Sequence, residues 1–233
     1  MDQRLMYRDE FFIGGRWERP AGGDVLEVIS PSTEEAVGRV PVAVDDDIDR
    51  AVASANAAYH EGEWPRMAPA ERADALARVA DLLRKREEEI AAVTTDEMGC
   101  ATSSARQAQT GLVAPVFDFY AELIRTYDFE RQVVTAERAG LVAQVPVGPV
   151  GAIVPWNAPV TLAAWKTAPA LAAGCTVVLK PPPEAPLSNF LLAEAVEEAG
   201  LPPGVVNVVP GGREVGERLV VHPSIDKIAF TGS

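Results

Sequence analysis

From Val150 onward, short and almost uncharged apolar runs alternate with segments of helical character. The runs are VGAIV, TVVL, VVNVV and KIAF, at residues 150–154, 176–179, 205–209 and 227–230. Strands this short and apolar are typically buried on both faces, and the helices between them supply the crossovers that parallel strands need. The pattern therefore predicts an α/β fold in which helices cover both faces of a parallel sheet.

The residues before Val150 predict a β-rich start, three helices and a hairpin. The strand-like runs, separated by Gly-Gly and Ser-Pro turns, lie at residues 11–17, 24–29 and 35–42. Helical periodicity follows over residues 45–59, 69–95 and 103–127. Two β-prone runs around Glu137 then predict an antiparallel hairpin over residues 131–147, which projects from the α/β unit.

Composition and charge exclude several function classes. A net charge of −13 disfavours nucleic-acid binding, and the two histidines are too isolated for a metal site. Two distant cysteines fit a reducing compartment, and the charged N-terminus lacks the apolar run of a secretion signal. The uncharged stretch 141–165 contains four prolines, which a membrane-spanning helix does not tolerate. The sequence predicts a cytoplasmic protein without membrane or nucleic-acid partners.

Unusual residues follow each of the four predicted strands. Ligands of an open parallel sheet bind beyond the carboxyl ends of its strands. The residues at these ends include a lysine, hydroxyl groups and glycines that permit close backbone approach, which suits a ribose and phosphates. They are residues 155–157, 180–184, 210–212 and 231–233.

Each of these residues also has a purely structural interpretation. Asn157 could cap the N-terminus of the following helix, and Lys180 alone would be a solvated lysine at a strand end. The G-x-G-x-x-G fingerprint is absent, and Gly212 and Gly216 form only a weak motif. The convergence of these residues on one edge of the sheet favours the binding interpretation.

Four motifs carry a resemblance to a known family. VGAIVPWNAP, AGCTVVLKPPPEAP, PPGVVNVVPGG and IDKIAFTGS occur in the order and spacing of the NAD(P)-dependent aldehyde dehydrogenases, and the segments FFIGGRW and SPSTEEAVGRVPVA are similar as well. The resemblance covers essentially the whole chain. It implies a Rossmann-like sheet that binds NAD or NADP, an aldehyde substrate, and a homo-oligomer, dimer or tetramer, built with the hairpin.

The resemblance also implies roles for individual residues. Asn157 would donate its amide N–H to the aldehyde oxygen while a cysteine thiolate attacks the carbonyl carbon. Lys180 would bond the adenosine ribose or a 2′-phosphate. The other cofactor contacts would come from Ile153, Val154, Pro155, Trp156, Asn157, Pro183, Gly212, Gly216, Phe230, Gly232 and Ser233.

This sequence departs from the family pattern in two places. The family often has K-P-S-E after its second strand, and that glutamate favours NAD by holding the ribose hydroxyls. Here the position is Pro183, and Glu184 comes one residue later, so the preference between NAD and NADP stays open. The nucleophilic cysteine and general-base glutamate of the family lie after the T-G-S motif, with which this sequence ends, and we expect the chain to be inactive by itself.

These patterns predict three parts. Residues 1–130 would be the N-terminal part of the cofactor-binding domain, residues 131–147 the oligomerisation hairpin, and residues 148–233 an incomplete Rossmann-like unit, with the catalytic domain absent. Two alternatives are a nucleotide-binding module that never had catalysis and part of a CoA-acylating relative, which passes the acyl group to a thiol.

Overall fold

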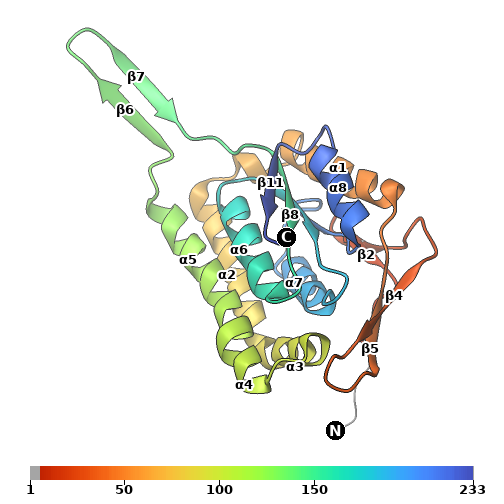
Figure 1. Ribbon diagram of the computed structural model, residues 1–233. Helices are drawn as coiled ribbons and strands as arrows, with labels where there is room; N and C mark the ends of the chain where they lie inside the picture. Colours follow the sequence, from red (N-terminus) through yellow and green to blue (C-terminus); the bar gives the residue numbers. More distant parts are fainter. Residues whose placement is uncertain (1–5, 233) are drawn as a thin grey trace.

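The computed structural model describes residues 6–232 and contains a central six-stranded sheet in the order β11-β8-β9-β10-β2-β3 (Figure 1). The four strands predicted from the apolar runs are all present and run parallel. They are β8 (Pro149–Ile153), β9 (Thr176–Lys180), β10 (Val206–Val208) and β11 (Lys227–Phe230). Every residue of β8, β9 and β10 is buried, as expected for strands covered on both faces.

The first predicted strand segment is a hairpin that joins this sheet. β2 (Phe11–Ile13) pairs antiparallel with β10, and β3 (Arg16–Glu18) pairs with β2. The two-residue turn between them uses Gly14 and Gly15 at φ values of 64° and 75°, a conformation that glycine adopts without strain. The backbone N–H of Gly14 donates to the side chain of buried Asn207 at 2.9 Å. The asparagine in the VVNVV run therefore anchors this hairpin to β10.

The other N-terminal strands form a separate sheet of three strands in the order β1-β5-β4. These strands are β1 (Met6–Tyr7), β4 (Val25–Ile29) and β5 (Ala36–Pro41). Val28, Val37 and Val40 of this sheet pack with Leu187 and Phe190, which lie on a helix next to the main sheet. The small sheet is therefore attached to the α/β unit through a shared apolar cluster.

Helices from both halves of the chain cover the main sheet. α1 (Asp45–His60) packs its Ile48, Ala51 and Val52 on one face, in the same cluster as Val178 and Val209 of the sheet region. α8 (Arg213–Val221) lies beside α1, whereas α6 (Pro159–Ala172) and α7 (Leu187–Glu198) cover the opposite face (Figure 1). The parallel strands of residues 148–233 are therefore fully covered on both faces only when α1 is included.

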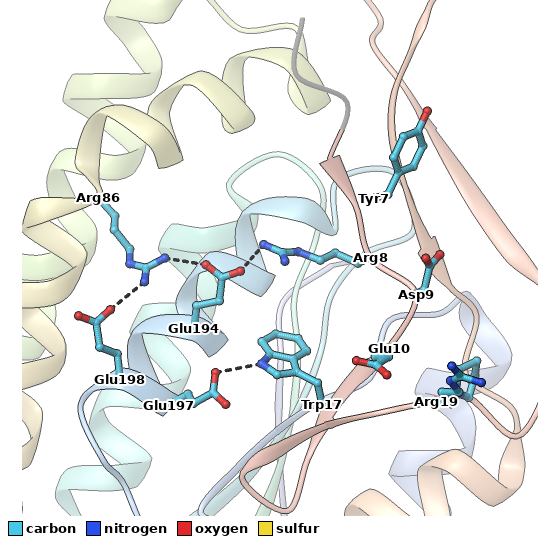
Figure 2. Close-up of a pocket in the computed structure, with 11 residues that line it drawn as sticks. Tyr7, Arg8, Asp9, Glu10, Trp17, Arg19, Arg86, Glu194, Glu197 and Glu198 are labelled. Atoms are coloured by element: carbon cyan, nitrogen blue, oxygen red, sulfur yellow. Dashed lines mark hydrogen bonds and ion pairs between the residues drawn. The ribbon is translucent and has the colours of Figure 1, made fainter.

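Two segments that the sequence predicts as continuous helices are interrupted in the structure, so these predictions are wrong. The segment 69–95 is divided at Arg86 into α2 (Pro69–Lys85) and α3 (Glu87–Met98). The guanidinium of Arg86 bonds Glu194 at 2.6 Å and Glu198 at 2.8 Å, both on α7. Figure 2 shows these residues beside a cavity of about 1070 Å³ in which Glu194 also pairs with Arg8. Charged contacts with another helix thus accompany the break.

The third predicted helix, 103–127, is also interrupted. It begins with the short α4 (Thr102–Ser104), continues as a π-helical turn at residues 105–109 and a 3₁₀ turn at residues 110–112, and becomes α5 (Val113–Thr126). The hydroxyl of Thr110 donates to the carbonyl of Ala105 at 3.2 Å within this irregular stretch. Single π turns inside helices are often found next to functional sites.

The predicted hairpin is present and projects away from the rest of the chain (Figure 1). It consists of β6 (Glu130–Val134) and β7 (Ala139–Ala143), which pair antiparallel. All residues of both strands are exposed, including Val134 and Leu141. Among the described residues no helix is both long and apolar enough to cross a membrane. The uncharged stretch 141–165 is instead divided among the end of β7, all of β8 and the first half of α6.

Candidate functional site

The strand register places three of the predicted cofactor contacts side by side. Ile153 at the end of β8 pairs with Lys180 of β9 on one side and with Phe230 of β11 on the other. Beyond this row, the N–H of Val154 donates to the Lys180 carbonyl at 3.3 Å, and the N–H of Thr231 donates to the Ile153 carbonyl at 3.2 Å. Val154 is buried, whereas the Phe230 side chain is 56% exposed. The predicted residues therefore form one continuous edge.

Lys180 is a cation of this edge and is only 6% exposed. A Cβ atom added at Gly216 on α8 would lie 3.8 Å from Lys180 Cδ and 3.9 Å from Ile153 Cδ1, so α8 and the two strand ends approach closely. Burial lowers the pKa of Lys180, and the nearby carboxylates of Glu184 and Glu214 oppose this shift. Within residues 6–232 its ammonium makes no hydrogen bond or ion pair. A buried ammonium without a partner is suited to a polar or anionic ligand.

Asn157 does not cap the following helix, so the structural interpretation of this residue is wrong. The N-cap of α6 is Ala158, and no side chain makes a cap hydrogen bond there. Asn157 is exposed, and its side-chain amide has no hydrogen-bond partner in the described part of the chain. Its carbonyl accepts a hydrogen bond of 3.4 Å from Gln109 Nε2, and the hydroxyl of Thr161 donates to the Gln109 carbonyl at 2.9 Å. These contacts fix the Asn157 peptide and leave its amide group available.

Trp156 and Pro183 meet at a second part of the edge. They line a cavity of about 500 Å³ together with Glu184, β4 and the end of α3. Pro155 precedes Trp156 and is half-buried, whereas the Trp156 side chain is 58% exposed. An exposed indole beside a cavity provides an apolar wall for a flat ligand.

A buried carboxylate supports the loop that carries Pro183. Glu97, near the end of α3, accepts hydrogen bonds from the backbone N–H groups of Leu187 at 2.6 Å and Ser188 at 3.2 Å. Burial raises the pKa of Glu97 to about 7, although these hydrogen bonds favour the ionised form. Sequence reasoning missed Glu97. A signal existed, because an acidic residue in the last turn of a helix opposes the helix dipole.

The glycine-rich segments differ in their roles. Gly212 is the N-cap of α8, and a Cβ atom added there would lie 2.5 Å from Glu214 Oε1, so the Glu214 carboxylate folds back over this residue. Gly232 has a φ of 153°, and a Cβ atom there would lie 3.0 Å from the Phe230 ring. The other predicted contact in this segment, Ser233, lies outside the described residues.

Lys166 on α6 was also missed by sequence reasoning. Its ammonium donates to the hydroxyl of Thr231 at 2.7 Å and so connects α6 to the loop after β11. Burial lowers the pKa of Lys166. Lys166 is the single charged residue in the otherwise uncharged sequence of α6. This feature could have identified it from the sequence.

An apolar groove lies between α5 and α6. It has a volume of about 360 Å³ and carries no charged side chain; its lining residues are Leu112, Pro115, Val116, Phe119, Tyr120 and Trp165. Gln109, which donates a hydrogen bond to the Asn157 carbonyl, lies three residues before Leu112, the first lining residue in the sequence. Sequence analysis did not identify the groove, although exposed aromatic residues on helices were a possible signal.

Neither cysteine is among the residues that follow the four parallel strands. Cys175 is buried and precedes β9, so it is at the opposite, amino end of the strands. Cys100 follows α3, and burial raises the pKa of its thiol. No group of three or more potential metal-ligating side chains occurs within residues 6–232.

Comparison with known proteins supports the resemblance. The model of the aldehyde dehydrogenase family matches residues 17–233. A geranial dehydrogenase of Castellaniella defragrans is 43% identical over 223 residues, which are 95% of this chain and 47% of that protein. A 3-succinoylsemialdehyde-pyridine dehydrogenase of a Pseudomonas species is 42% identical over 96% of this chain and 46% of its own length. The chain therefore spans about half the length of the curated relatives it matches.

Solved structures agree with this result. The aldehyde dehydrogenase of Mycobacterium tuberculosis complexed with NAD+ matches 99% of this chain and 48% of its own, with a TM-score of 0.96 and 41% identity. A mutant of aldehyde dehydrogenase C from Pseudomonas syringae, complexed with NAD+ and octanal, matches 98% of this chain and 45% of its own, with a TM-score of 0.88 and 41% identity. The predicted Rossmann-like α/β fold is confirmed, and the chain belongs to the aldehyde dehydrogenase family.

Proposed function

We propose that this chain is the cofactor-binding part of an enzyme that oxidises an aldehyde to a carboxylic acid with NAD+ or NADP+. The observation that carries the proposal is the row of Lys180, Ile153 and Phe230 at the carboxyl edge of the parallel sheet, with Asn157 immediately beyond it. The NAD+ complexes among the similar structures support it. In this proposal the whole enzyme acts on the aldehyde, and these 233 residues supply only part of its active site.

The residues of the edge fit a dinucleotide. A Cβ atom added at Gly216 would lie within 4 Å of both Lys180 and Ile153, so the glycine lets α8 approach these two strand ends closely. The Lys180 ammonium would donate to the adenosine ribose, and Trp156 would cover the cofactor from the cavity side. When bound, NAD(P)+ supplies the hydride acceptor of the reaction.

Asn157 would act on the substrate. Negative charge develops on the aldehyde oxygen when a nucleophile attacks the carbonyl carbon, and a fixed amide N–H stabilises that charge. The bond from Gln109 holds the Asn157 peptide before substrate arrives. Cys175 lies at the amino end of the strands, and Cys100 follows α3 and not a strand of the parallel sheet. In this proposal the nucleophilic thiol comes from outside these 233 residues, as the resemblance to the family implies.

The apolar groove would hold the hydrocarbon part of the aldehyde. Its lining residue Leu112 follows Gln109 by three residues in the chain, and the aromatic side chains of Phe119, Tyr120 and Trp165 line it as well. A groove without charged side chains favours uncharged substrates, because a charged group would lose its hydration there without gaining a partner.

We also propose a division of the chain into parts. Residues 1–130 and 148–233 together form the cofactor-binding part, since α1 and β2 belong to the layers of the main sheet. Residues 131–147 form a separate hairpin for assembly. The two free thiols support a reducing, cytoplasmic location.

The hairpin is expected to hold subunits of a homo-oligomer together. Replacing residues 130–143 with a short Gly-Ser linker should convert a dimer or tetramer into a monomer, because both exposed strands and their apolar side chains would be removed. Light scattering coupled to size-exclusion chromatography measures the mass, and circular dichroism controls for folding. An unchanged oligomeric mass in the linker variant would contradict this role.

Calorimetric titration with NAD+ tests the cofactor function directly in this chain. We expect saturable binding at one site, with competition from 5′-AMP, because the adenosine half of the cofactor would contact Lys180 and α8. Aldehyde oxidation is then measured with the longer enzyme, by NADH or NADPH formation. A folded chain that binds neither NAD+ nor NADP+ would contradict the proposal.

A further inference from the structure

A buried carboxylate on α3 holds the beginning of α7. Glu97 is only 3% exposed, and its Oε2 and Oε1 atoms accept hydrogen bonds from the backbone N–H groups of Leu187 at 2.6 Å and Ser188 at 3.2 Å. These are the first two residues of α7, whose N-cap, Pro186, makes no side-chain cap hydrogen bond. Glu97 therefore satisfies the free N–H groups at the start of α7 as a capping side chain would, although it comes from another helix.

The loop between β9 and α7 depends on what holds its two ends. It consists of residues 181–186, four of which are prolines, and its two backbone N–H groups make no hydrogen bond in the described part of the chain. Prolines fix φ, so the loop is stiff and a shift at one end is carried along it. The hydrogen bond of 3.3 Å from the Val154 N–H to the Lys180 carbonyl fixes one end, and Glu97 fixes the other.

This loop lies at the proposed cofactor edge. It begins directly after Lys180 and carries Pro183, which lines the cavity of about 500 Å³ beside Trp156. Glu97 lines the same cavity. A change in the hydrogen bonds of Glu97 would therefore act on the wall that the cofactor is proposed to contact.

The Glu97 carboxylate has no partner of opposite charge within the described residues. The other titratable groups that line its cavity are Glu27 of β4 and Glu184 of the loop, and no lysine, arginine or histidine is among the lining residues. Arg106, in the irregular stretch that packs on α3, pairs instead with a glutamate in the first turn of α3. After α3, burial and the Glu97 charge both raise the pKa of the Cys100 thiol.

Protonation would disturb this arrangement. Each carboxylate oxygen accepts one N–H group, so a proton on either oxygen turns an acceptor into a donor and weakens one of the two hydrogen bonds. It also removes the negative charge that suits a helix N-terminus. Because burial raises the pKa of Glu97 to about 7, both forms are populated near neutral pH.

We propose that Glu97 is a positioning residue for the cofactor: its ionised carboxylate holds the 181–186 loop in the shape that binds NAD+, and protonation loosens the loop. The inference rests on the proposed cofactor function. NAD+ affinity is then higher above neutral pH than below it. Stability changes in the opposite direction, because folding raises the pKa of Glu97 from 4.5 to about 7, and the stability that this carboxyl contributes at low pH is lost across that interval as the pH rises.

The test is calorimetric titration of the chain with NAD+ between about pH 6 and about pH 8. The wild-type chain should bind NAD+ roughly 2- to 12-fold more weakly at the lower pH, which is the scale of one hydrogen bond. Glu97→Gln offers one acceptor oxygen and cannot ionise, so it should bind weakly at both pH values. Glu89→Gln, at an exposed position on the same helix, is the control and should keep the wild-type pH profile.

Melting temperatures separate positioning from a merely structural role. Relative to Glu97→Gln, the wild-type chain should lose stability as the pH rises from 4.5 to about 7, whereas its advantage in NAD+ affinity should grow. The contributions of other titratable groups are common to both chains and cancel in this comparison. Glu97→Asp keeps an ionisable group and should retain part of the pH profile.

Three results would contradict the inference. A wild-type chain with the same NAD+ affinity at both pH values, or a folded Glu97→Gln chain with wild-type affinity and pH profile, contradicts it and leaves the proposed cofactor function intact. A wild-type chain that binds neither NAD+ nor NADP+ at either pH contradicts the proposed function together with this inference. Circular dichroism shows whether each variant is folded, and the wild-type profile and Glu97→Asp decide the question even where Glu97→Gln fails to fold.

Discussion

Replacement of Asn157 by alanine is expected to lower kcat about 10²–10³-fold in the longer enzyme, which corresponds to about 2.7–4 kcal/mol in the barrier. The side-chain amide is exposed and has no hydrogen-bond partner in the described part of the chain. As the aldehyde oxygen becomes negatively charged, it would accept a hydrogen bond from this amide. Because this interaction strengthens only as charge develops, the cofactor KM should change little. Steady-state kinetics with several aldehydes, at saturating cofactor, measures the effect.

The same variant separates catalysis from stability. Since Ala158 is the N-cap of α6 and no side chain caps the helix, Asn157→Ala should leave the melting temperature nearly unchanged. Loss of a true N-cap would instead cost about 1 kcal/mol of stability. A variant with wild-type kcat and a clearly reduced melting temperature would show that Asn157 is structural.

Replacement of Lys180 by alanine is expected to weaken NAD+ binding roughly 10- to 150-fold, the effect of losing a hydrogen bond from a charged donor, about 1.5–3 kcal/mol. The loss should be larger for NADP+, because a 2′-phosphate depends more strongly on the ammonium charge. Calorimetric titration of the chain measures both affinities.

Lys227→Ala is the matched control for this variant. Lys227 is exposed and begins β11, so it lies at the amino end of the strands, opposite the proposed site. The Lys227→Ala substitution removes the same positive charge as Lys180→Ala and should leave the affinities for NAD+ and NADP+ unchanged. Equal losses in the two variants would indicate a general charge effect, and unchanged affinities in a folded Lys180→Ala chain would show that Lys180 does not contact the cofactor.

The parallel strands and the residues at their carboxyl ends could be predicted from the sequence because their signals are local. Each apolar run is bounded by turn residues, and the topology of alternating strands and helices brings their carboxyl ends to one edge. The predicted bounds of β11 agree with the structure, and those of β8 and β9 differ from it by one residue at each affected end. The resemblance to a family then supplied roles that the residues alone did not determine.

The breaks in the helices could not be predicted in this way. The periodic pattern continues through Arg86, and the break there accompanies contacts with Glu194 and Glu198, more than 100 residues away. The irregular stretch 105–112 likewise meets α6 through Gln109 and Thr161. Local propensity does not contain these partners, so it predicts uninterrupted helices.

The sequence by itself determined the fold class, the hairpin and the edge at which Asn157 and Lys180 lie, because hydrophobic periodicity and turn residues act over short distances. Only the tertiary structure decided that β2 joins the main sheet and α1 covers it, that Glu97 supports the loop at Pro183, and that α8 approaches Lys180 at Gly216. Each of these contacts joins segments that are at least 30 residues apart, and their strength comes from burial and charge in three dimensions. No local pattern in the chain encodes such distances.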